Sequence, residues 1–85
     1  MTALHSRISS DAARIADLGN RADRCLRAGM FDEVKACIRE IVVIGERTER
    51  PTVARFASAV ATSLNRRMRE EAAQRLVEML EERRV

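Results

Sequence analysis

The fold of this chain is decided at Gly29-Met30-Phe31-Asp32, the sharpest break in a sequence that otherwise favours helix. Gly29 stands where a left-handed residue ends a helix, because glycine adopts positive φ without a steric penalty. Asp32 is a good N-cap for the following helix, and Glu33 adds a negative charge to its first turn. The stretch therefore predicts a tight turn between two helices. We expect these helices at residues 2–28 and 33–44.

A second break, at Gly45, is predicted to end the middle helix and to open a short charged connection. Pro51 follows that connection and is tolerated in the first turn of a helix, where its missing N–H is not needed. Apolar residues then recur every four positions as far as Leu80, which predicts a third helix over 52–83. Because such a row turns by about 40° at each step, its two ends face different directions.

The composition excludes the all-β, collagen-like and disordered classes. The 85 residues include three Gly, one Pro and two Phe, with no Trp or Tyr, and 46% are hydrophobic. This composition is typical of helices, and the length fits one domain over 1–85. The predicted fold class is all-α, a small three-helix bundle with long first and last helices. It becomes a four-helix bundle if Gly19-Asn20 breaks the first helix or the charged segment 65–71 breaks the third.

The expected helices differ in length. At about 1.5 Å per residue they span about 40, 18 and 48 Å, so the middle helix is too short to cover both long ones. The far ends of the long helices would leave apolar side chains bare, and pairing with a second copy is the simplest way to cover them. We therefore expect a homodimer. The predicted interaction residues are Leu4, Ile8, Ile15, Leu76, Met79 and Leu80.

The first turn also carries the pattern of a known helical repeat. A small residue at Ala22, the turn Gly29, the start Phe31-Asp32-Glu33 and the apolar Ile38 fall at matching positions. Residues 16–45 thereby resemble a single hairpin of the tetratricopeptide-repeat family. The resemblance implies a protein-binding helical hairpin without catalytic residues.

No arrangement of residues in the sequence suggests an enzyme or a metal site. The single histidine, His5, has no Cys or Glu at ligand spacing, and the carboxylates fall at spacings typical of intrahelical ion pairs. Cys25 and Cys37 are expected opposite each other across the hairpin, where small apolar residues let two helices approach. A disulfide or redox pair is the less favoured alternative for these cysteines, and a metal site the least favoured. We expect no catalytic, cofactor-binding or metal-binding residues.

The charge pattern supports a rival interpretation, a small DNA- or RNA-binding regulator. Sixteen basic residues against thirteen acidic ones give a net charge of +3, and arginines gather on two helix faces. The candidate nucleic-acid contacts are Arg7, Arg14, Arg21, Arg66, Arg67 and Arg69. Against a helix-turn-helix, the connection after Gly45 is longer than the usual turn of about 3–4 residues. The helix after Pro51 is also poor in side chains that read base edges, and acidic residues interleave with the arginines.

No segment of the sequence resembles a membrane or targeting sequence. The longest apolar run is Ile41-Val42-Val43-Ile44, against about 20 residues for a membrane span, and residues 1–7 hold no apolar signal region. We expect a cytoplasmic protein with reduced cysteines and no membrane partner. Fifteen arginines against the single Lys35 suggest a bacterial or phage genome.

The predicted function is therefore a non-enzymatic protein–protein interaction module that acts through amphipathic helices. Regulator, inhibitor, adaptor and secretion-chaperone-like roles all fit this class. The expected partners are a second copy of the chain and a further, unidentified protein.

Overall fold

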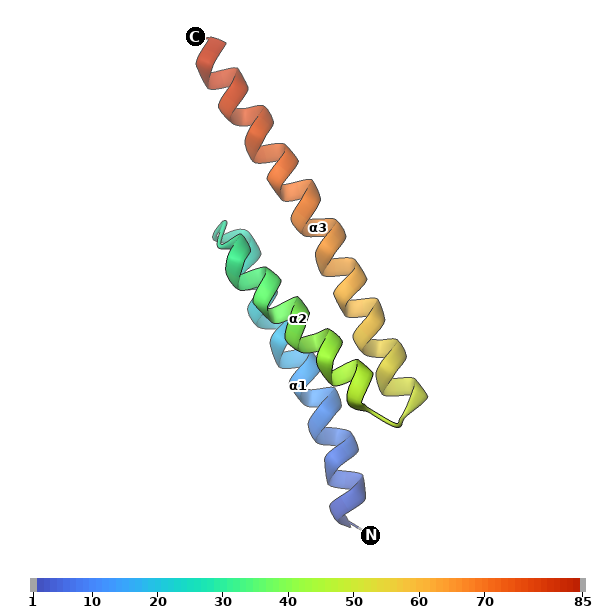
Figure 1. Cartoon of the computed structure of the whole chain (residues 1–85). Coiled ribbons are helices and arrows are strands. Elements are labelled where there is room, and N and C mark those ends of the chain that lie inside the picture. The colour runs from blue at the N-terminus through green and yellow to red at the C-terminus, as the bar shows by residue number, and fades with distance from the viewer. Residues whose placement is uncertain (1, 85) are drawn as a thin grey trace.

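The chain forms three helices that pack around one core. The computed structural model describes the backbone of residues 2–84 and the side chains of residues 10–83. In chain order the helices are α1 (Thr2–Arg27), α2 (Phe31–Arg47) and α3 (Pro51–Arg84), of 26, 17 and 34 residues (Figure 1). Residues 2–84 contain no strand. The prediction of an all-α, three-helix fold with long outer helices is confirmed.

The turn between α1 and α2 has the geometry that Gly29 predicts. Its φ is 75°, the left-handed conformation that glycine adopts readily. The N–H of Met30 donates to the carbonyl of Cys25 at 2.9 Å, and the N–H of Gly29 donates to that of Leu26 at 3.1 Å. These two bonds make a Schellman motif, which satisfies carbonyls that the end of α1 leaves without partners.

The start of α2 differs from the prediction by two residues. Met30 is the N-cap, and no side-chain hydrogen bond caps this end of the helix. Asp32 and Glu33 lie inside the first turn of α2, where their charge favours the N-terminal end of the helix dipole. Asp32 therefore acts through its charge and not as the cap.

Two glycines that could break helices lie within them instead. The helix α2 continues past Gly45 to Arg47. A Cβ at position 45 would lie only 2.8 Å from the Cβ of Ala57 in α3. Gly45 thus lets α2 and α3 approach closely. Likewise α1 runs unbroken through Gly19, which faces Val60 across the interface with α3. Neither long helix breaks, so the four-helix alternative is wrong.

The core consists of one apolar row from each helix. In α2 the buried residues are Val34, Cys37, Ile38 and Ile41, as the periodicity predicts, with Ile44 partly buried against them. The buried residues contributed by α1 and α3 are Ile15, Leu18, Ala22, Leu26, Val53, Ala57, Ala61 and Leu64.

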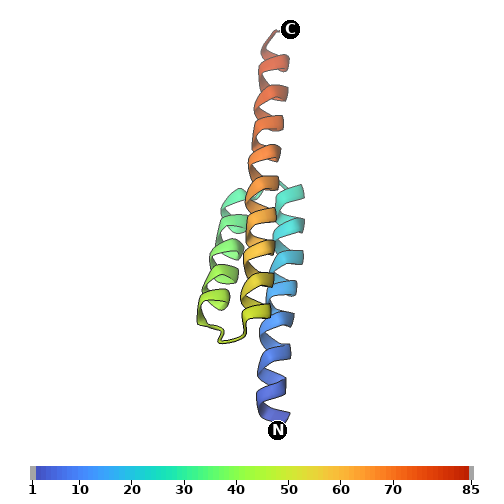
Figure 2. The same cartoon turned by 90° about the vertical axis from the view of Figure 1, so that its right-hand side faces the viewer.

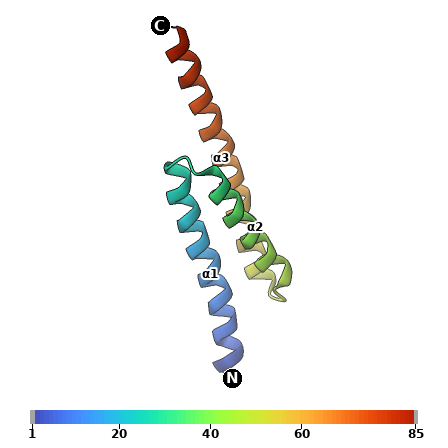
Figure 3. The same ribbon diagram turned by 60° about the vertical axis from the view of Figure 1, so that its left-hand side comes forward.

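The molecule is a rod with overhanging ends. It measures 65 × 18 × 13 Å, and its radius of gyration of 16.1 Å exceeds the roughly 12 Å of a compact chain of this length. The helices run up, down and up, so the start of α1 and the end of α3 project at opposite ends of the rod (Figures 2 and 3). The length mismatch expected from the sequence is therefore present.

Candidate interaction surface

Among residues 10–83, the part of α3 that projects beyond the other helices carries the most exposed large apolar side chains. We call residues 69–84 the tail, because Met68 is the last α3 residue that packs against the core. Four large apolar residues of the tail are about half exposed: Leu76 (56%), Val77 (46%), Met79 (52%) and Leu80 (55%). Nothing in the described part of the chain covers them.

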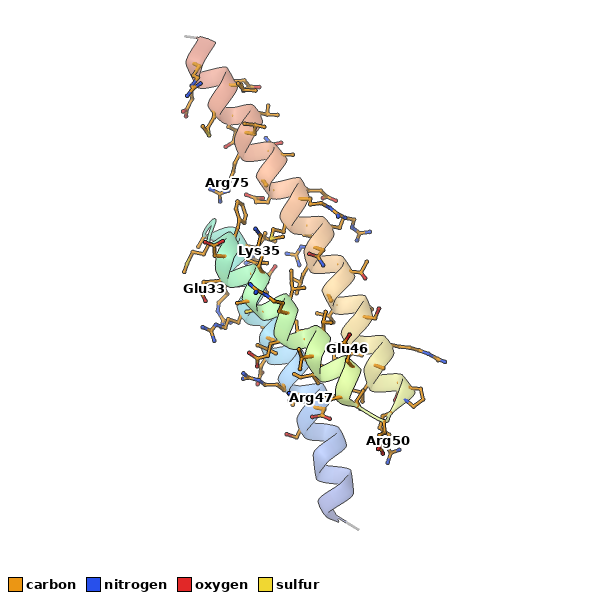
Figure 4. The ribbon with its side chains drawn as sticks, in the orientation of Figure 1. Glu33, Lys35, Glu46, Arg47, Arg50 and Arg75 are labelled. Atoms are coloured by element: carbon orange, nitrogen blue, oxygen red, sulfur yellow. The ribbon has the colours of Figure 1, made fainter. Side chains whose placement is uncertain are left out.

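Arg75 connects the base of the tail to the turn between α1 and α2. Its guanidinium lies 5.7 Å from the ring centre of Phe31 and donates a 3.4 Å hydrogen bond to the carbonyl of Arg27. Its Nε also lies 3.3 Å from a carboxylate oxygen of Glu71, one turn earlier in α3. Figure 4 shows Arg75 reaching from α3 toward the turn. The contacts of Arg75 therefore identify the side of the tail that faces the rest of the molecule.

The apolar side chains of the tail lie on a different face. Successive residues of a helix are about 100° apart, so Leu76 points well away from the direction of Arg75. Ala72, Leu76 and Met79 share one stripe along the helix through their spacing of four and three residues, and Leu80 borders it. The row that continues the core of α3 through the tail is instead charged, consisting of Glu71, Arg75, Glu78 and Glu82. Leu76 and Leu80 thus lie away from the row that continues the core, whereas Met79, 18 residues after the buried Ala61, lies about 40° from Arg75 at the border of that row.

The predicted interaction residues divide into three groups. Leu76 and its two neighbours Met79 and Leu80 are exposed on the tail. Ile15 is fully buried, so its assignment to an interaction surface is wrong. The preceding residue, Arg14, pairs with Glu40, so Ile15 lies beside the middle of α2, within the helix that the sequence already predicts. The side chains of Leu4 and Ile8 lie outside the described residues.

Most of the predicted nucleic-acid contacts are engaged with acidic side chains. On α1, Arg14 pairs with Glu40 of α2, and the guanidinium of Arg21 lies 3.7 Å from the carboxylate of Glu33. On α3, Arg67 pairs with Asp23 of α1, while Arg66 lies 3.9 Å from Glu70. Arg69 is exposed, and the side chain of Arg7 lies outside the described residues. Three of these four pairs connect two helices, and all four place a negative charge beside an arginine on the expected basic faces.

The hydrogen bond from Arg67 holds the pKa of the Asp23 carboxyl below its usual range, and Arg27 adds to the effect. Arg27 also contacts the Asp23 carboxylate at 3.0 Å. Asp23 is therefore the centre of an ionic link between α1 and α3.

The connection between α2 and α3 is shorter than the sequence predicts. It consists of the three residues Thr48–Arg50, shorter than expected, because α2 runs past Gly45. The connection therefore has the length of the turn in a helix-turn-helix motif, about 3–4 residues. However, α2 and α3 run back alongside each other as neighbours in a bundle (Figures 1 and 2), not at the steep angle of that motif.

A groove that the sequence does not reveal runs between α1 and α3. Its volume is about 680 Å³, and Ala16, Gly19 and Ala59 contribute to its small-residue lining. Phe56, one of the apolar residues that recur every four positions in α3, lines this groove with 40% of its surface exposed. The spacing of Phe56 matches the core row, but its position at the edge of that row leaves the ring half outside.

The cysteines lie at the α1–α2 interface as small packing residues. Cys37 is buried and Cys25 is half-buried, and both are free thiols. Burial raises the pKa of the Cys37 thiol, which disfavours the reactive thiolate. Among the side chains that the structure describes, no group of three or more His, Cys, Asp or Glu residues could hold a metal ion.

Comparison with known proteins yields no relative. No protein-family model, no curated protein and no solved structure matches this chain. Within the described residues, no helix combines the length and the apolar character that crossing a membrane requires.

Proposed function

We propose that this chain is a small non-enzymatic protein–protein interaction module that binds through the tail of α3. The observation that carries the proposal is the apolar stripe of Leu76, Met79 and Leu80, exposed on a helix that projects beyond the rest of the fold. With Val77, these side chains present roughly 400 Å² of apolar surface. That lies within the range of about 300–600 Å² for the largest patch on a typical monomer, which is often functional.

The shape of the tail supports the same role. It is already helical before any partner binds, so association costs less conformational entropy than the folding of a disordered segment would. The charged residues around the stripe can contribute partner selection and association rate. A regulator, inhibitor, adaptor or secretion-chaperone-like protein in the cytoplasm would use such a surface, and a second copy of the chain is the first partner to test.

The test compares the wild-type chain with the double variant Leu76→Glu/Leu80→Glu. Sedimentation equilibrium measures self-association, and pull-down followed by calorimetry on each captured protein measures binding to others. We expect the wild type to associate, and the variant to lose the same association while keeping its helical circular dichroism spectrum.

Two results would contradict the proposal. One is a wild-type chain whose associations are all unaffected by the double substitution. The other is tight binding to nucleic acid at physiological salt that Arg66→Ala/Arg67→Ala abolishes, because phosphate contacts would then carry the function.

A further inference from the structure

Resting on the proposed function, we infer that the apolar stripe binds the tail of a second copy, running antiparallel, with Leu76 opposite the partner's Met79. The two rods then overlap end to end through their tails. The overlap covers residues 72–83, beyond Met68, the last α3 residue that packs against the core.

The tail has the spacing of a coiled-coil seam. The seam positions follow one another at intervals of three and four residues, which is the heptad pattern of two paired helices. They are Arg69, Ala72, Leu76, Met79 and Arg83. Leu76 and Met79 form the central layers, and each is more than half exposed in the single chain.

The charges within the seam favour the antiparallel direction. In a parallel pair the two copies of Arg69 would face each other, and so would the two copies of Arg83, which places like charges inside the contact. In the antiparallel pair Arg83 lies opposite the partner's Ala72, whose small side chain leaves room for the arginine stem.

The positions that flank the seam are complementary in the same register. On one side Arg75 comes opposite the partner's Glu82, and two-fold symmetry produces this pair of opposite charges twice. The Arg75 side chain remains 43% exposed beside Phe31, so a carboxylate can reach it. On the other side Ala73 comes opposite the partner's Leu80, which extends the apolar contact. A parallel pair forms neither of these matches.

The area involved predicts a reversible dimer. Without Val77, the exposed apolar side chains Leu76, Met79 and Leu80 supply less than half of the roughly 800 Å² per partner of a standard stable interface. The core of each copy lies away from the tail, so the dissociated chain remains folded. We expect dissociation in the micromolar range.

The first arm of the experiment is sedimentation equilibrium on the wild type and two matched variants. Leu76→Glu places a charge in the seam, and we expect it to weaken dimerisation at least tenfold. Val77→Glu makes the same change at the adjacent residue, which is similarly exposed but outside the seam, and we expect a change of less than about threefold. Unchanged circular dichroism of both variants shows that the fold is intact.

The second arm measures the direction of pairing. A spin label on Arg55→Cys, in a chain that also carries Cys25→Ala and Cys37→Ala, reports the distance between the two rods. The antiparallel overlap places the labels about 65–70 Å apart, whereas a parallel pair places them within about 40 Å.

Each contrary result has a distinct meaning. A short label distance overturns the antiparallel register, and equal effects of the two Glu variants overturn the seam. A wild type that stays monomeric at several hundred micromolar overturns the second copy as the occupant. In that last case the proposed function still stands if another protein binds in a Leu76-dependent manner, and it fails if none does.

Discussion

The two halves of α3 carry the same repeat of apolar side chains, but only the first half buries them. From Pro51 to Met68 the helix buries a row of apolar side chains against α1 and α2, whereas from Arg69 onward the apolar side chains are exposed. The four-residue repeat is the same in both segments. What differs is the residue on the side facing the other helices, which is Ala57 or Leu64 in the first segment and Glu71 or Arg75 in the second. An apolar repeat alone therefore does not identify a core, because its direction relative to neighbouring helices decides whether it is buried.

The largest expected effect comes from truncating one apolar side chain in each half of α3. Leu64→Ala removes a buried side chain from the first half of α3 and should lower the free energy of unfolding by about 2–5 kcal/mol. Leu76→Ala should change it by less than about 0.5 kcal/mol in the monomer, because Leu76 is more than half exposed. Urea unfolding at a protein concentration low enough to keep the chain monomeric checks both values. A loss above 2 kcal/mol for Leu76→Ala would mean that the tail packs within its own chain.

A second prediction concerns the glycines at the helix interfaces. In Gly45→Ala the new Cβ would lie 2.8 Å from the Cβ of Ala57, so α2 and α3 must separate, and we expect a loss of about 1–3 kcal/mol. In Gly19→Ala the nearest atom, on the flexible side chain of Val60, lies at 3.4 Å, an ordinary contact. Here the better helix propensity of alanine should leave stability unchanged or raise it by up to about 1 kcal/mol. Thermal unfolding of the two variants provides the comparison, and a destabilised Gly19→Ala would show tighter packing of α1 on α3.

The same glycines show what the sequence could reveal and what it could not. The number of helices, the turn at Gly29 and the buried face of α2 follow from local patterns, namely capping and 3.6-residue periodicity. Gly45 has the same local signature whether it ends a helix or admits a neighbour, and only the position of Ala57 in space distinguishes the two. Ile15 was misassigned because it lies beside the middle of α2, at the level of the Arg14–Glu40 pair, and not on the projecting end of α1.

The candidate site was predictable only in part. Leu76, Met79 and Leu80 stand out in the sequence because the length mismatch leaves the end of α3 without a neighbour. The contact between Arg75 and Phe31 joins residues far apart in the chain, and no local pattern indicates it. Only this contact shows that the charged side of the tail, and not the apolar side, faces the other helices. The tetratricopeptide-repeat resemblance of residues 16–45 stays a prediction, because a Schellman turn at Gly29 suits any tight pair of helices.

A third prediction tests the contact between the tail and the turn that joins α1 and α2. Arg75→Ala removes the contact with the Phe31 ring and the hydrogen bond to the Arg27 carbonyl, and should cost about 0.5–1 kcal/mol of stability. The matched control is Arg69→Ala, an exposed arginine on the same helix, for which we expect no measurable change. Denaturant unfolding of the two variants side by side checks the difference. Equal values would show that Arg75 does not connect the tail to the turn.

The smallest expected effect is the pH dependence that Asp23 adds to the packed part of the molecule. The hydrogen bond from Arg67 lowers the pKa of Asp23 in the folded chain below that of an aspartate in the unfolded chain. Because the folded state holds the proton less tightly than the unfolded state, the link contributes its full stability above the unfolded pKa. The contribution is lost as the pH falls through the lowered folded pKa. Unfolding measured between pH 6 and pH 2 should therefore show a decline in the wild type that is shallower in Asp23→Asn. Glu78→Gln removes an exposed carboxylate of the tail and should keep the wild-type slope, because Glu78 lies outside the ionic link between α1 and α3. If the two variants gave the same profile, the acid sensitivity would belong to the general charge of the rod and not to the link between α1 and α3.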